Sequence, residues 1–397
     1  MLDNLLRGVR VLDLTQNVAG PFCTQILGDF GAEVIKVERP GGGDDTRLWT
    51  PPDICGHSST FMALNRNKQS LCVDLSKPEG ADIVGRLAAE ADVLVHSMKP
   101  GSAENRGLGP DALCEANPRL IYCAISAFGE IGPLAQLPGY DPLMQAFTGI
   151  MSVTGNEGDD PVRVSVSLID MGTGMWAALG ILAAYISRLQ TGRGLRVNAS
   201  LLETGMSWMT IFIAGYLASG RSPRKLGSAM SMAAPYQLFR SSDGYVFIAA
   251  GNDRLFVKVC DALGCPALVA DPRFAANSDR VVNRAALQTE IEARTMKTTS
   301  ADIVAALRAV GAPCSELNTV EQAINHEQVA ALGMVADLSM PGVPGLKTVP
   351  LPLRVNGERA GALQPPPLLG EHTDAILDRL GLDVQERRNL RQAGVVA

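Results

Sequence analysis

One aspartate, Asp170, lies between an apolar run and a turn of small residues, in the sequence VSVSLIDMGTG at residues 164–174. A carboxylate in that position can cap the N-terminus of the helix that follows, or it can lie at the mouth of a cleft as a reactive group. The local pattern favours the cap. In a dry site, however, a carboxylate can attack an activated acyl group if water is kept from the resulting anhydride.

Charged residues gather around a glycine turn near the start of the chain. Glu38 and Arg39 precede the turn Gly41–Gly43, and Lys36 and Arg47 flank this group. An acid here could bind a ribose, and the neighbouring arginine suits a ligand that also carries phosphate groups, such as CoA. A solvated charged loop would give the same pattern. Further cations near later strand ends favour a polyanionic ligand, namely Arg66, Lys68, Lys99 and Arg106.

The elements that must position these residues alternate between strands and helices. An apolar run at residues 9–14 predicts a strand, a helix at 22–30 follows, and a second strand covers 32–38. The alternation predicts fold class α/β, with a Rossmann-like, doubly wound parallel sheet. Its later elements are a helix at 79–90, a strand at 92–96, a helix at 109–116 and a strand at 120–126.

The turn after the first strand, Thr15–Pro21, is where such a sheet would bind a ligand. It lacks the GxGxxG pattern, so a dinucleotide pyrophosphate held against a glycine turn is not expected. Taken alone, this turn is as compatible with a structural role as with a binding role.

Composition excludes several classes of protein. The net charge of −6 argues against a nucleic-acid groove. The eight cysteines and four histidines show neither zinc-ligand spacing nor a disulfide framework, so we expect no metal site and reduced thiols. The apolar stretches at 175–186 and 205–218 are shorter than a membrane span and predict core helices, and the N-terminus does not resemble a signal peptide. We therefore expect a cytoplasmic protein without nucleic-acid or membrane partners.

Several long motifs, in order along nearly the whole chain, resemble the class III CoA-transferases, the CaiB/BaiF family. The pattern is closest to the succinyl-CoA:dicarboxylate (glutarate-type) enzymes, through VERPGGGDDTR, NRNKQS and PLLGEHT. The resemblance rests on GVRVLDLTQNVAGPFCTQILGDFGAEVIKVERPGGGDDTR, LNRNKQSLCVDL, ADVLVHSMKPG, SAFGEIGPLAQLPGYDPLMQAFTGIMSVTG, SLIDMGTG, TGRG and PPPLLGEHTDAIL.

This resemblance implies that Asp170 is the covalent nucleophile of a CoA transfer that needs neither ATP nor a metal. CoA or acyl-CoA would then be a substrate, with no tightly bound cofactor. The implied CoA contacts are Val18, Ala19, Arg39, Val73, Asp74, Leu75, Ser76, Ser97, Met98, Lys99, Arg106, Tyr140 and Asp141.

The resemblance also implies a domain organisation. Residues 1–220 would form the first part of a large α/β domain, 221–325 a smaller α+β domain, and 326–397 a segment that returns to the large domain. The change of character after residue 220 supports the smaller domain. Two chains would form a homodimer of interlocked rings, a feature that comes from the resemblance alone.

The chain departs from the family pattern at a few positions. Ser97–Met98 replaces a pair that is often Asn followed by Phe or Tyr, and Asn105 precedes Arg106 where the oxalate enzyme has its arginine. Met230 stands where many relatives have a histidine, in a region that lacks the glycine-rich loop of the oxalate enzyme. The departure at Ser97–Met98 concerns the contacts to the adenine or the pantetheine of CoA, and the departure at Met230 concerns the acyl pocket, so the acids that are exchanged remain open.

Two other functions compete with CoA transfer between succinyl-CoA and a small dicarboxylate. An α-methylacyl-CoA racemase shares the family fold, but its relatives carry His-Asp where this chain has Tyr140–Asp141, so one proton-transfer partner is missing. A CoA-binding protein without activity would use Asp170 only as a helix cap.

Overall fold

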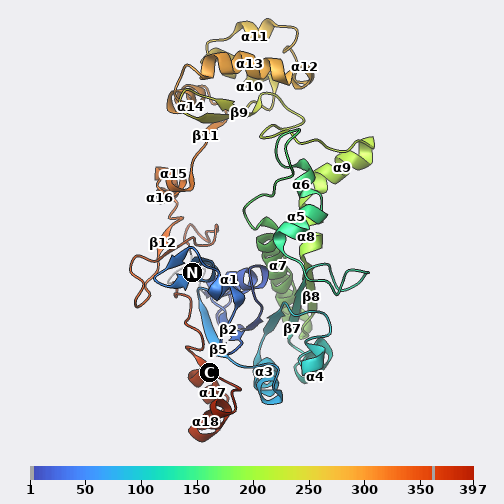
Figure 1. Ribbon diagram of the computed structural model, residues 1–397, viewed down its shortest axis with the longest axis vertical. Helices are drawn as coiled ribbons and strands as arrows, with labels where there is room; N and C mark the ends of the chain where they lie inside the picture. Colours follow the sequence, from blue (N-terminus) through green and yellow to red (C-terminus); the bar gives the residue numbers. More distant parts are fainter. Residues whose placement is uncertain (1–3, 360–362) are drawn as a thin grey trace. The chain divides into compact units, whose positions relative to one another are not determined.

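In the computed structural model, which describes residues 4–359 and 363–397, the chain forms two compact units (Figure 1). Among the described residues, the large unit comprises 4–150, 163–218, 332–359 and 363–397, and the small unit comprises 151–162 and 219–331. The predicted boundaries at 220 and 325 thus lie two and six residues from those observed. Residues 151–162, which the sequence places in the large domain, belong to the small unit.

A six-stranded parallel sheet is the centre of the large unit, and the predicted mixed α/β fold is confirmed. The strand order is β5-β2-β1-β6-β7-β8, which is the 3-2-1-4-5-6 order of dinucleotide-binding folds. Its switch point therefore lies between β1 and β6. The strands are β1 (Arg10–Leu14), β2 (Glu33–Glu38), β5 (Lys68–Cys72), β6 (Val93–His96), β7 (Ile121–Ser126) and β8 (Arg196–Ser200).

The two edge strands do not follow from the sequence pattern. β5 has the sequence KQSLC and β8 has RVNAS, so neither carries the continuous apolar run that marks a strand buried on both faces. The central strands do carry such a run. In β1, for example, every residue after Arg10 is buried.

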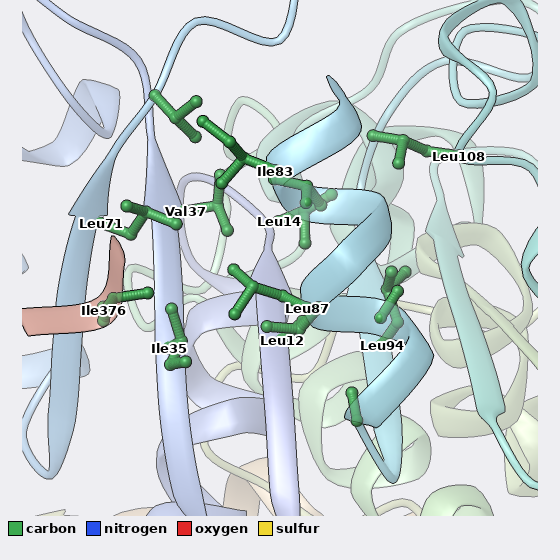
Figure 2. Packing of buried hydrophobic residues seen from close by; sticks show 14 of the residues in the cluster. Leu12, Leu14, Ile35, Val37, Leu71, Ile83, Leu87, Leu94, Leu108 and Ile376 are labelled. Atoms are coloured by element: carbon green, nitrogen blue, oxygen red, sulfur yellow. The ribbon is translucent and has the colours of Figure 1, made fainter. Parts of the chain in front are cut away.

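Helices cover the sheet. α1 (Ala19–Asp29) packs against α7 (Leu168–Thr191), where Gly174 allows the α7 backbone to approach the Ala19 carbonyl closely. α3 (Pro78–Glu90) shares a hydrophobic core with the strands, in which Ile83 lies near Val37 and Leu87 lies near Leu12 (Figure 2). The same core includes side chains of α4 (Pro110–Ala116) and α17 (Thr373–Arg379).

The large unit also contains short elements. These are the 3-10 helices η2 (Asp45–Leu48) and η3 (Glu104–Arg106), the hairpins β3 (Asp53–Ile54) with β4 (His57–Ser58) and β12 (Ala336–Asp337) with β13 (Lys347–Thr348), and the helices α2 (Ser59–Leu64), α5 (Asp141–Phe147), α8 (Leu201–Trp208), α9 (Thr210–Ser219) and α18 (Val384–Gln392). The helix α6 (Ile150–Val153) lies at the boundary between the units.

The small unit is built on an antiparallel sheet with its own hydrophobic core. The strands, in the order β11-β10-β9, are β9 (Tyr236–Arg240), β10 (Tyr245–Ala249) and β11 (Cys314–Glu316). Its helices are α10 (Asp253–Ala262), α11 (Ala267–Ala270), α12 (Asn277–Val282), α13 (Arg284–Thr295), α14 (Ser300–Ala309), α15 (Val320–Ile324) and α16 (Glu327–Ala331).

The helix α7 is longer than the apolar stretch at 175–186 suggested. By length and composition it could cross a membrane, and the bent pair α8–α9 passes the same test if it counts as one span. The expectation that the stretch at 175–186 is too short is therefore wrong, whereas α8 and α9 taken singly are each shorter than a span. α7 nevertheless packs against α1, β7 and β8, as the core helix of a globular protein does.

Buried ion pairs fasten the carboxyl end of β1 to its neighbours. The Asp13 carboxylate accepts hydrogen bonds from Lys68 Nζ at 3.0 Å and from Thr24 Oγ1 at 2.7 Å. Burial alone would raise the pKa of Asp13, but Lys36 and Lys68 hold it below its usual range. Burial is also the largest influence on Lys68, whose pKa is lowered to about 8. Because these charges are paired, β1, β2 and β5 are fixed relative to one another.

Candidate active site

The two turns that meet at the switch point form the floor of the candidate site. One follows β1 and the other follows β6. They are joined by a hydrogen bond from Gln16 N–H to Ser97 Oγ at 3.2 Å. The turn after β6 is also fixed by the last residue of the strand, since His96 Nδ1 accepts a hydrogen bond from Met98 N–H at 3.3 Å. Burial lowers the pKa of His96 to about 4, so the imidazole is neutral at pH 7 and can accept this bond.

Two clefts adjoin at these turns. The Asp170 cleft, of about 240 Å³, contains Asp170 and the first residues of α1. The basic groove, of about 360 Å³, contains Arg39, Arg106 and the segment after β5. Both clefts are lined by the same five residues, Gln16, Asn17, Ser97, Met98 and Lys99. One elongated ligand could therefore occupy both clefts at once.

The structure brings nearly all the predicted site residues to these clefts. Val18, Ala19, Tyr140 and Asp170 line the Asp170 cleft, and the residues shared by both clefts include Ser97, Met98 and Lys99. Asp141 is the exception, because it is buried and lines neither cleft. The predicted residues in the basic groove are Arg39, Val73, Asp74, Leu75, Ser76 and Arg106.

Asp170 lies in the first turn of α7, but it does not cap the helix. The capping bonds come from Asp141 of α5, whose Oδ2 accepts hydrogen bonds from the N–H groups of Ile169 at 2.7 Å and Asp170 at 3.1 Å. Within the part of the chain that the structure describes, the Asp170 carboxylate itself has no hydrogen-bond or ion-pair partner. The local pattern, which favours a cap at Asp170, therefore assigns the wrong carboxylate to that role.

The environment of Asp170 favours its protonated form. Burial is the main cause and the negative charge of Asp141 adds to it, so that the pKa of Asp170 is raised to about 7. Asp141 is fixed in place by Gln145, whose Nε2 donates to Asp141 Oδ1 at 2.5 Å and to the Val164 carbonyl at 3.0 Å. A half-buried carboxylate with a strongly raised pKa, open to a cleft, is typical of a reactive group.

The basic groove has fewer cations than the sequence suggests. Arg39 lines the groove, and within the described residues its only ion-pair partner is Asp45, which is itself 44% exposed. Arg106 also lies there, with Nη1 donating to the Ser102 carbonyl at 2.7 Å, and Lys99 makes no ion pair within the described residues. These three side chains can be reached by a ligand.

The other predicted cations are internal. Arg47 makes a bidentate contact with Glu38, and Arg66 pairs with Asp29. Lys36 and Lys68 are fully buried beside Asp44 and Asp13. The prediction that these four side chains contribute to a polyanion site is therefore wrong, because each is paired with a carboxylate inside the fold. Glu38, the acid that a dinucleotide-binding fold would offer to a ribose, is likewise occupied by Arg47 and Ser70.

The comparisons with known proteins agree on one family. Residues 6–373 match the model of CoA-transferase family III. The chain is 40% identical to succinyl-CoA:glutarate CoA-transferase of Mus musculus, over 94% of this chain and 85% of the relative. It is 37% identical to acetyl-CoA:oxalate CoA-transferase of Acetobacter aceti, over 85% of this chain and 87% of the relative.

The chain belongs to CoA-transferase family III. A crystal structure of a CAIB/BAIF family protein from Brucella suis superposes with a TM-score of 0.86 at 39% identity, covering 95% of this chain and 99% of that one. This family III chain is thus an enzyme that uses CoA thioesters as substrates, and the alternative of a CoA-binding protein without activity is excluded.

Sequence reasoning missed two residues that line both clefts of this family III enzyme, Gln16 and Asn17. The sequence predicts that the turn containing them is a place where a ligand could bind, but it gives no signal that singles out these two residues within the turn. It also missed the role of Asp44, whose Oδ1 accepts a hydrogen bond from Asn17 N–H at 3.2 Å, because this contact joins residues that are distant along the chain. Met230, at the departure from the family pattern, belongs to the small unit.

The raised pKa of Asp170 predicts a pH-dependent stability. Between about pH 4 and pH 7 the folded chain holds a proton that the unfolded chain releases, so the free energy of unfolding falls as pH rises through this window. Asp170→Asn removes this dependence. The stability of that variant relative to the natural chain should therefore rise with pH, by at most about 1.4 kcal/mol per pH unit, and level off above pH 7.

Urea unfolding of both proteins at a series of pH values measures the difference. Asp141→Asn is the matched control, since it removes the neighbouring charge while keeping an acceptor for the α7 N–H groups. With Asp141→Asn present, the pKa of Asp170 should be lower, so the stability difference caused by Asp170→Asn should level off at a lower pH. A stability difference that does not change between pH 4 and 7 would show that Asp170 titrates normally.

Proposed function

We propose that this enzyme moves CoA reversibly from an acyl-CoA, with succinyl-CoA as the donor, to a small dicarboxylate, through covalent intermediates on Asp170. The observation that supports this most strongly is the position of the Asp170 carboxylate. It has no partner in the described part of the chain, and it lines a cleft that continues into a groove with Arg39, Lys99 and Arg106. A nucleophile and a site for the phosphates of CoA are thereby connected.

The transfer has two halves that mirror one another. First, an Asp170 carboxylate oxygen attacks the thioester carbon of the donor, the carbon–sulfur bond breaks, and the CoA thiolate leaves behind a mixed anhydride. The thiolate then attacks the Asp170 carbonyl carbon of that anhydride. The donor acid departs as a carboxylate, and Asp170 now carries CoA as a thioester.

In the second half, the acceptor carboxylate attacks the Asp170 thioester, which releases the thiolate and forms a new anhydride. The thiolate attacks the acceptor acyl carbon of this anhydride, so that the new acyl-CoA forms and the Asp170 carboxylate is restored. No proton is gained or lost overall, and no ATP is consumed, because one thioester is exchanged for another.

The N-terminus of α1 is suited to stabilise the oxyanions of these steps. Val18 is its N-cap residue, and no side chain in the described part of the chain caps the helix. The first N–H groups of a helix have no partner within the helix, and Val18, Ala19 and Gly20 line the Asp170 cleft. Backbone donors held in this way stabilise negative charge that develops on a carbonyl oxygen.

The choice of acids follows from the relatives rather than from the geometry. The mouse relative is named for glutarate and the Acetobacter aceti relative for oxalate, so the family III framework accepts different dicarboxylates. The sequence pattern is closest to the glutarate-type enzymes. We therefore assign a four- or five-carbon dicarboxylate, such as glutarate, itaconate, mesaconate or malate, as the acceptor.

We further propose that two chains form an interlocked homodimer. Large apolar side chains are exposed on α7 and α9, among them Trp176 at 46% and Leu217 at 76%, and no residue of α9 is buried. Many exposed large apolar side chains on two helices favour an interface at these helices. A cytoplasmic location, and the absence of nucleic-acid, membrane and tightly bound cofactor partners, stay predictions.

Replacing the proposed nucleophile tests the covalent route. Asp170→Ala should lower kcat by about a thousand-fold or more, while the affinity for CoA changes little because the basic groove is intact. With the natural chain and an acyl-CoA, hydroxylamine should trap Asp170 as a hydroxamate, which mass spectrometry can locate. The matched control is Asp82→Ala, which changes an exposed aspartate of α3 and should leave turnover unchanged. Steady-state turnover retained by Asp170→Ala would exclude the mechanism.

The acceptor is tested by incubating the purified enzyme with succinyl-CoA and a panel of acids, and by detecting new acyl-CoAs with mass spectrometry. We expect products from the four- and five-carbon dicarboxylates. Products only from oxalate, carnitine-type or aromatic acceptors would overturn the assignment. Incorporation of deuterium from solvent at the α-carbon of an α-methylacyl-CoA, without acyl exchange, would instead indicate the racemase.

Subunit exchange distinguishes interlocked rings from an ordinary dimer. Sedimentation should give twice the mass of one chain at all accessible concentrations. When tagged and untagged dimers are mixed, interlocked chains should form no mixed dimers until the protein is unfolded and refolded, whereas an ordinary dimer exchanges by dissociation. A monomer, or rapid exchange under native conditions, would contradict the proposal.

A further inference from the structure

The junction between the two clefts contains polar side chains with no assigned role. Of the residues that line both clefts, Gln16 and Asn17 belong to the turn after β1. Both side chains are half-buried, and their carboxamide groups make no hydrogen bond within the described residues. A carboxamide offers two N–H donors and a carbonyl acceptor, and at these two residues the groups are available to a ligand in the clefts.

The backbone of Asn17 is fixed, so its side chain is held at the junction. Asn17 has a φ of 67°, a left-handed conformation that asparagine adopts more readily than most residues. Its N–H donates to Asp44 Oδ1, and Asp44 is buried and pairs with Lys36 at 2.8 Å. Burial alone would raise the pKa of Asp44, but Lys36 keeps it low, so Asp44 stays a charged acceptor near neutral pH.

A CoA ester that spans both clefts must cross this junction. If its phosphates lie beside the cations of the basic groove and its thioester beside Asp170, the arm between them passes over the shared residues. That arm carries secondary amides, which are matched by donors and acceptors of the carboxamide kind. Val18 and Ala19, the neighbours in the same turn, line only the Asp170 cleft.

We propose that the Asn17 carboxamide, with that of Gln16 beside it, hydrogen-bonds the amides of the pantetheine arm of CoA. This inference rests on the proposed function and adds a binding residue to it. Asn17 then recognises the arm rather than the nucleotide, and it fixes how far the thioester extends toward Asp170.

Asn17→Gly isolates the side chain from the backbone. Glycine adopts a positive φ freely and keeps the N–H that donates to Asp44, so only the carboxamide is lost. Calorimetric titration should show weaker binding of CoA by roughly 2- to 10-fold, the value of one neutral hydrogen bond. The affinity for the adenosine bisphosphate fragment of CoA, which lacks the arm, should not change.

Arg39→Ala is the matched comparison, because it removes a cation of the basic groove and should weaken both ligands alike. Thermal denaturation confirms that each variant folds.

Equal losses for CoA and the fragment in Asn17→Gly, or no loss for either, would overturn the inference. A natural chain that binds neither ligand would instead contradict the proposed function itself.

Discussion

The ion pair between Lys36 and Asp44 is the interaction on which the geometry of the site depends. Lys36 is fully buried within β2, where it also donates to the Thr15 carbonyl at 2.9 Å, and Asp44 accepts a hydrogen bond from the N–H of Asn17. The pair thus sets the turn that leads into α1 and, through the Gln16–Ser97 bond, its contact with the turn after β6. A charged group left alone in this place would be strongly destabilising, so both partners must be present for the turn to form.

Charge in the large unit is divided between structure and binding according to burial. The buried cations are paired with carboxylates, and some of these pairs join β1, β2 and β5. Others fix the C-terminal segment. Arg47, for example, also donates a hydrogen bond to the Pro367 carbonyl at 3.1 Å. Cations at the basic groove remain exposed to a ligand. A protein with a net charge of −6 can therefore offer a polyanion site, because the local arrangement of accessible cations matters and the total does not.

The sequence was informative wherever the signal was local. The apolar runs predicted the central strands and the ligand-binding edge, and the motifs indicated the family, which the comparisons confirmed. The pattern missed β5 and β8, whose sequences KQSLC and RVNAS lack the continuous apolar run of a strand buried on both faces. It also assigned the cap of α7 to Asp170, since a cap supplied by Asp141, 29 residues earlier, leaves no local trace. Likewise, which lysines and arginines are buried depends on partners that are distant in sequence.

The burial of Asp170 has opposite consequences for the proposed chemistry. A dry surrounding protects an anhydride from water and makes a carboxylate more reactive, but it also raises the pKa to about 7, so that much of the empty enzyme is protonated at neutral pH. The charge of Asp141 adds to this cost, yet its carboxylate is needed to hold the N–H groups of the first turn of α7. A site that kept Asp170 fully ionised through a nearby cation would pair the nucleophile and reduce its reactivity. Leaving it unpaired and half-buried keeps the ionised fraction at neutral pH available for attack.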